Sequence, residues 1–165
     1  MEWNLKVVRL TGMWLASLIG AVYGLLFTII GAGLDWGPGG GMEGPYWKVI
    51  IVGLISILVG MYTGEFSVRK LSSISKVFDK PRKRTEVALA MFLICSFSSV
   101  LAWILSWEAG YISGILMGSI GWDEILNWGQ IIFDVALMSF IFGFPFYLLA
   151  GILNALVAMF VLNKW

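Results

Sequence analysis

The chain has 165 residues, of which 59% are hydrophobic and 13% are charged, and its mean hydropathy is +0.89. A soluble domain of this size cannot bury so many apolar side chains, so the composition predicts an integral membrane protein. The sequence has no histidine and one cysteine, Cys95, which excludes disulfides within the chain, Cys/His zinc sites and His-ligated haem, and its net charge of +1 conceals an uneven charge distribution.

The first apolar run covers about 10–34 and predicts a retained signal-anchor helix, because about 20 residues of helix cross a hydrocarbon core of roughly 30 Å. Small residues that recur three or four positions apart on one side of a helix let helices approach closely in lipid. Candidate helix-packing residues of this kind occur in the first and second runs at Gly12, Ala16, Gly20, Gly24, Gly53 and Gly60. Packing within the chain explains them, and contact of the first stripe with another subunit is the alternative.

The second apolar run covers about 47–66, and a basic connection over 67–86 follows it. Because cations collect on the cytoplasmic side of a membrane, this connection is predicted to be a cytoplasmic loop, with both termini on the same side. Such a loop attracts anionic lipid headgroups, and contact with a partner protein fits the same pattern. The connection holds seven of the eleven Lys and Arg residues, and these are the candidate lipid or partner contacts: Arg69, Lys70, Lys76, Lys80, Arg82, Lys83 and Arg84.

The third apolar run, about 87–107, places Ser96 and Ser99 near the middle of the membrane. Serine hydroxyls readily bond to their own helix backbone, and lining a polar pathway is the functional alternative. An outer interfacial segment is predicted over 108–129. Within it, residues 111–120 are too few to cross the membrane and too apolar to lie in water, so they are either interfacial or re-entrant.

The fourth apolar run covers about 130–162 and would be about 50 Å long as one straight helix. That length exceeds the hydrocarbon core, so Asp134 is expected near the outer headgroups, with ion or proton handling as the alternative. Pro145 removes a backbone hydrogen bond and predicts a kink or a break. Tyr147 and Asn154 are expected to bond to neighbouring helices, and both are candidate pathway residues together with Ser96, Ser99 and Asp134.

These runs predict an all-α integral membrane protein with one domain over 1–165 and four transmembrane helices. Its termini are expected in the cytoplasm and its location in the plasma membrane. Catalysis needs a nucleophile, an acid–base pair or a bound metal placed together, and no such pattern is present, so neither an enzyme nor a cofactor is expected. Nucleic acid is not an expected partner either.

The function expected from these features is that of a non-catalytic membrane subunit. Its partners would be membrane lipids, anionic on the cytoplasmic side, together with other membrane subunits or further copies of the chain. The alternative is a small oligomeric transporter or channel, with a pathway along the third and fourth spans.

Overall fold

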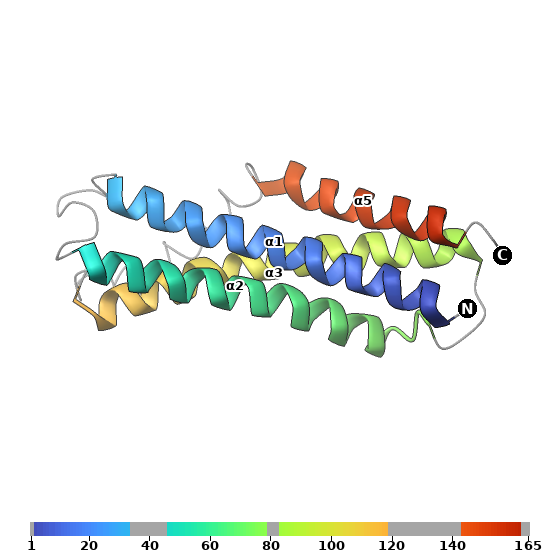
Figure 1. Ribbon diagram of the computed structural model, residues 1–165, viewed down its shortest axis with the longest axis horizontal. Helices are drawn as coiled ribbons and strands as arrows, with labels where there is room; N and C mark the ends of the chain where they lie inside the picture. The colour runs from blue at the N-terminus through green and yellow to red at the C-terminus, as the bar shows by residue number, and fades with distance from the viewer. Residues whose placement is uncertain (1, 34–45, 79–82, 119–142, 163–165) are drawn as a thin grey trace.

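The computed structural model describes residues 2–33, 46–78, 83–118 and 143–162. Within these residues the regular structure is entirely helical, with α1 (Glu2–Gly33), α2 (Tyr46–Ile74), α3 (Arg84–Leu116) and α5 (Phe144–Val161) labelled as in Figure 1. Each of the four helices is long enough and apolar enough to cross a membrane. Within the described residues, the prediction of an all-α protein with four helices long and apolar enough to cross a membrane is therefore confirmed.

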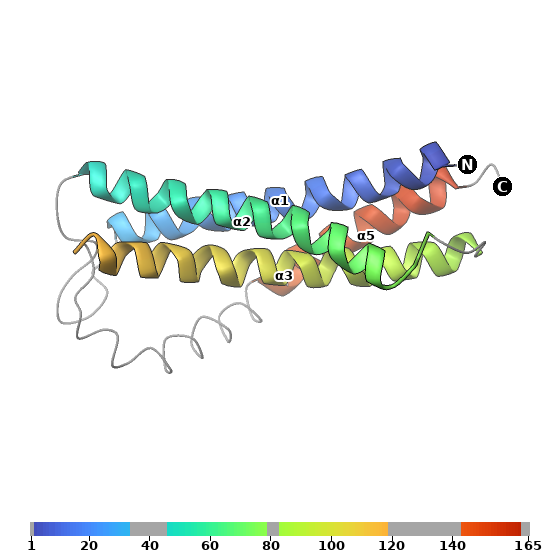
Figure 2. The same ribbon diagram turned by 90° about the horizontal axis from the view of Figure 1, so that it is seen from below.

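The helices form an elongated bundle in which α1, α2 and α3 run side by side (Figures 1 and 2). Helix α5 packs against α1 and α3, and it lies along only one half of their length. We call one end of the bundle the terminal end; it holds the start of α1, the end of α2, the start of α3 and the end of α5. The opposite end, which we call the far end, holds the end of α1, the start of α2 and the end of α3.

Helices α2 and α3 continue beyond the apolar runs that predicted them. Helix α2 extends past residue 66 to Ile74, so Arg69 and Lys70 lie on a helix and the connection between helices is shorter than 67–86. Helix α3 continues past residue 107 to Leu116, so residues 108–116 belong to the same helix as the third apolar run, and 119–129 of the predicted outer segment lie outside the described residues. The physical reason is that hydropathy marks where apolar residues stop, whereas a helix continues while its backbone bonds are made.

Helix α5 begins close to the predicted interruption at Pro145. Gly143 is its N-cap residue and Pro145 lies in the first turn, where the missing N–H of proline costs nothing. The helix has 18 residues, about 27 Å at 1.5 Å per residue, which is near the lower end of the length of membrane-spanning helices. Asp134 and the rest of 130–142 lie outside the described residues.

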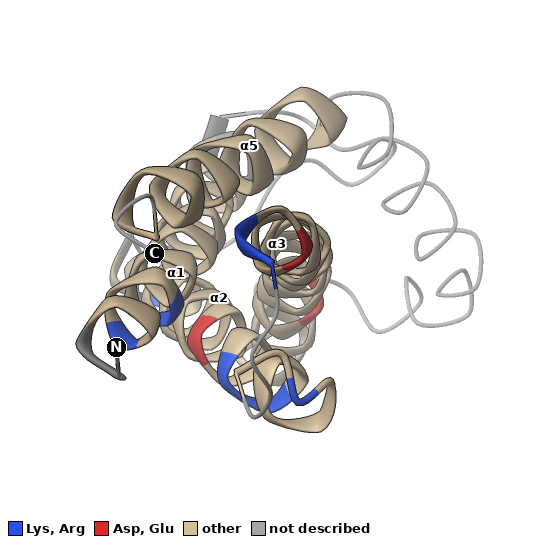
Figure 3. Cartoon of the chain, turned by 90° about the vertical axis from the view of Figure 1, so that its right-hand side faces the viewer, with Lys and Arg blue, Asp and Glu red and all other residues tan. Residues whose placement is uncertain are grey.

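The bundle buries mostly small and medium-sized residues, together with a few aromatic ones, and presents many large apolar side chains outward. A buried cluster near the terminal end joins the helices through Val8, Met91, Ala158 and Val77, the last from the connection after α2. Trp14 is 76% exposed and Phe160 is 82% exposed, so the outer surface is apolar, as a lipid-facing surface must be. Described Lys and Arg residues gather at the terminal end, as Figure 3 shows, whereas Lys48 lies near the far end.

Candidate functional site

The contact between α1 and α2 is made by backbone against backbone. A Cβ added to Gly60 would lie 2.6 Å from the carbonyl oxygen of Gly20, and one added to Gly24 would lie 2.6 Å from the amide nitrogen of Ile57. One added to Gly64 would lie 2.5 Å from the Ala16 backbone. From Ala16 to Gly24 the stripe in the first run therefore faces α2 of the same chain, and α2 covers this part of the surface on which contact with another subunit would depend.

The two remaining candidate packing residues also lie at contacts between helices. A Cβ added to Gly12 would come within 2.7 Å of the Asn154 side chain on α5. A Cβ added to Gly53 would overlap the side chain of Thr28 on α1. Because the neighbouring atoms lie so close, the six small residues named from the sequence position α1, α2 and α5 relative to one another.

A reciprocal pair of serines joins α2 to α3 at the centre of the bundle. The hydroxyl of Ser56 donates to the carbonyl of Ser106 at 2.7 Å, and the hydroxyl of Ser106 donates to the carbonyl of Ser56 at 2.9 Å. Both residues are completely buried. Ser106 was not identified from the sequence, although Ser98, Ala102, Ser106 and Gly110 repeat at four-residue intervals in α3, the spacing that marked α1.

The serines proposed as pathway residues bond to helix backbone. Ser99 donates to the carbonyl of Cys95 in its own helix at 2.8 Å, and Ser96 donates to the carbonyl of Tyr147 on α5 at 3.1 Å. The Cys95 thiol lies 3.6 Å from the carbonyl of Ala150, so a second weak contact supports the same pair of helices. The two serines therefore have different surroundings: Ser99 bonds within α3, and Ser96 links α3 to α5.

An aromatic cluster surrounds the beginning of α5. The ring centroid of Trp103 lies 4.9 Å from that of Tyr23 and 5.7 Å from that of Tyr147, which joins α1, α3 and α5. The Tyr147 side chain also lies against Gly143, where a Cβ would overlap its ring. Tyr23 and Trp103 were not identified from the sequence, because a single aromatic residue in an apolar helix does not differ from a lipid-facing one.

Several buried polar atoms of α3 and α5 have no hydrogen-bond partner. Asn154 is fully buried, and neither its amide nitrogen nor its amide oxygen makes a hydrogen bond. The Ser98 hydroxyl and the indole N–H of Trp103 are also buried without a hydrogen-bond partner. Leaving such atoms unpaired costs about 1–3 kcal/mol each, so these positions are the least favourable polar sites of the described interior.

The described part of the basic connection is held against the bundle. Val77 is buried in the core cluster near the terminal end, and Lys76 just before it has a positive φ of 50°, so the chain turns sharply there. Arg69 forms an ion pair with Glu65 one turn earlier on α2. Lys83 is the N-cap residue of α3 and Arg84 is its first residue, whereas Lys80 and Arg82 lie outside the described residues.

Taken together, the apolar exterior and the four long helices define the class as an integral membrane protein. Among the described residues, no three or more His, Cys, Asp or Glu side chains come together as a possible metal site. Comparison of the chain with protein-family models, with curated proteins and with solved structures found no match.

Proposed function

We propose that the chain is a non-catalytic integral membrane subunit that packs with other membrane helices in a larger complex. The observation that carries the proposal is the close packing of α1, α2 and α3 against one another. Glycine backbones touch there, and the buried hydroxyls of Ser56 and Ser106 are satisfied by backbone carbonyls. A closely packed centre of this kind favours a structural role, and the apolar outer faces are available to lipid and to neighbouring subunits.

The proposal includes an orientation in the plasma membrane, with the terminal end in the cytoplasm. The described Lys and Arg residues gather at this end, which agrees with the tendency of cations to remain on the cytoplasmic side. In this position the basic connection would contact anionic lipid headgroups or a cytoplasmic partner. Attachment of a membrane-impermeant label to a cysteine introduced in place of Ser73, an exposed residue near the end of α2, tests the orientation in sealed spheroplasts.

Native mass spectrometry of the chain, purified from its own cells in a mild detergent, tests the subunit proposal. We expect a different membrane polypeptide to accompany it at a constant stoichiometry that survives a second purification step. A lone monomer would contradict the proposal. A stable complex of identical chains would instead favour the transporter alternative, because small transporters commonly build their pathway from repeated copies or repeated halves.

A small transporter or channel with a pathway along α3 and α5 is the second candidate, and the unpaired polar atoms favour it. The buried Asn154 amide and Ser98 hydroxyl lie on the two helices that this alternative requires. Polar groups inside a membrane protein commonly mark solute pathways. Purified protein in liposomes loaded with ion-sensitive dyes tests the idea. Flux through the wild-type protein that disappears with Asn154→Leu would support a pathway. Wild-type flux no greater than that of empty liposomes would contradict the transporter alternative.

A further inference from the structure

The outer face of α2 carries a row of three side chains, Tyr62, Phe66 and Lys70, which we call the α2 stripe. They follow one another at four-residue intervals, which places them on one side of the helix. The rings of Tyr62 and Phe66 are stacked, with centroids 5.8 Å apart and an angle of 18° between their planes. They are 68% and 50% exposed, so no described element covers the stack.

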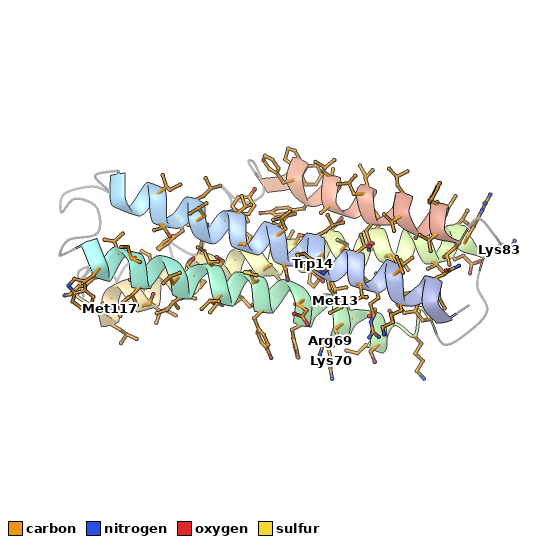
Figure 4. The ribbon with its side chains drawn as sticks, viewed as in Figure 1. Met13, Trp14, Arg69, Lys70, Lys83 and Met117 are labelled. Atoms are coloured by element: carbon orange, nitrogen blue, oxygen red, sulfur yellow. The ribbon has the colours of Figure 1, made fainter. Side chains whose placement is uncertain are left out.

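The charged part of the α2 stripe lies one turn closer to the terminal end. Lys70 is exposed, and Figure 4 shows the side chains of Lys70 and Arg69 extending from the outer side of α2. Arg69 pairs with Glu65, which neutralises the only described carboxylate close to the stripe on α2. A guanidinium has five N–H donors, so Arg69 retains donors for an external anion while it holds Glu65.

We propose that the α2 stripe binds one anionic phospholipid. The headgroup phosphate would accept hydrogen bonds from Lys70 and Arg69, and an acyl chain would lie along the stacked rings. Tyr62 and Lys70 are eight residues apart, about 12 Å along the helix, so the phosphate and the first acyl carbons of one lipid can reach both. The stripe thus combines a cationic tip with an apolar platform, which matches the two chemical parts of such a lipid.

The inference rests on the proposed function, because it assumes that the terminal end lies at the membrane surface and attracts anionic lipid. It adds a specific location. A diffuse electrostatic attraction would involve every cation at this end, each more strongly the closer it lies to the lipid headgroups. A site on α2 depends instead on Lys70 and on the rings next to it. Lys83 provides a matched control, since it is exposed at the same end and precedes α3 with no stacked rings beside it among the described residues.

Native mass spectrometry of the full chain, released from nanodiscs of equal parts phosphatidylglycerol and phosphatidylcholine, tests the site. We expect the wild-type chain to retain one phosphatidylglycerol preferentially. Lys70→Gln should lower this retention about fivefold, the effect of one cation near a membrane surface, and Lys83→Gln should leave it unchanged. Phe66→Leu should also lower it by breaking the stack, and circular dichroism should show unchanged helix content in all three variants.

The possible results separate the site from the proposed function. Equal losses from Lys70→Gln and Lys83→Gln would overturn the site and leave a diffuse attraction of lipid to the basic end. No preference for phosphatidylglycerol in the wild-type chain would overturn both the site and the lipid contact. If the chain is purified from its own cells and Lys70→Gln releases a polypeptide, without changing lipid retention, the occupant is a protein and the lipid site is wrong.

Discussion

Gly60→Ala is expected to destabilise the bundle although it favours the isolated helix. The new Cβ would lie 2.6 Å from the carbonyl oxygen of Gly20, whereas a comfortable carbon–oxygen contact is about 3.3 Å. The shortfall is about 0.7 Å. The two nearest atoms are the carbonyl oxygen and carbon of Gly20, and because backbone atoms cannot rotate aside, α1 and α2 must move apart. The same change adds about 1 kcal/mol to the intrinsic preference for helix, so helix propensity alone predicts the opposite sign.

The magnitude follows from what the separation removes. A gap of 0.5–1 Å loses roughly a quarter to a half of the dispersion attraction between the surfaces that part. Overpacking in well-packed interiors costs about 1–3 kcal/mol, and we expect Gly60→Ala to reach the upper part of that range because the obstruction cannot rotate away. The Ser56–Ser106 hydrogen bonds lie at the same junction, since a Cβ on Gly60 would also be 2.9 Å from the Cβ of Ser106.

Equilibrium unfolding in mixed micelles, with increasing sodium dodecyl sulfate and helix content followed by circular dichroism, provides the assay. Val22→Ile is a suitable control, because it also adds one carbon and Val22 is exposed on the outer side of α1. The control should unfold at the wild-type detergent fraction and Gly60→Ala at a lower one. If the two variants unfold together, or Gly60→Ala is the more stable, then the helices are not in backbone contact and the reasoning fails.

Three further changes test other parts of the structure by the same unfolding assay. In a double-mutant cycle, Ser56→Ala and Ser106→Ala should show a favourable coupling of about 0.6–1.7 kcal/mol, and additive effects would contradict the reciprocal hydrogen bonds. Asn154→Leu should stabilise the bundle by about 1–3 kcal/mol, since it removes a buried amide without partners; a loss of stability would mean that the amide is bonded. Lys48→Met should cost about 0.3–1 kcal/mol, because the ammonium group donates to the Met117 carbonyl at the end of α3 at 2.7 Å, and wild-type stability would exclude this capping role.

Helix number and the small-residue contact faces were predictable from the sequence because both depend on local patterns. Four apolar runs marked the helices, and small residues at four-residue intervals marked the side of α1 that meets α2 and, at Gly12, α5. The helix ends were less predictable. Residues such as Arg69 and Lys70 end an apolar run without ending a helix, because a charged side chain can reach the membrane surface while its backbone continues in α2.

The candidate site was only partly predictable. Ser96 and Ser99 are alike in the sequence, yet one bonds to α5 and the other within α3, since neighbouring residues on a helix point in different directions. The Asn154 amide was expected to bond to a neighbouring helix, and instead it is buried without a hydrogen bond. No local pattern reports whether a partner atom will be within reach.

The sequence by itself determined that this is a helical membrane protein with its cations concentrated between the second and third apolar runs. Length, hydropathy and charge are properties of single segments, and the membrane acts on each segment separately. Only the tertiary structure decided that Gly20 meets Gly60, that Ser56 and Ser106 pair, and that α5 covers half of the bundle. These features depend on how each helix is rotated and shifted against its neighbours, which is set by the sum of many weak contacts between distant segments.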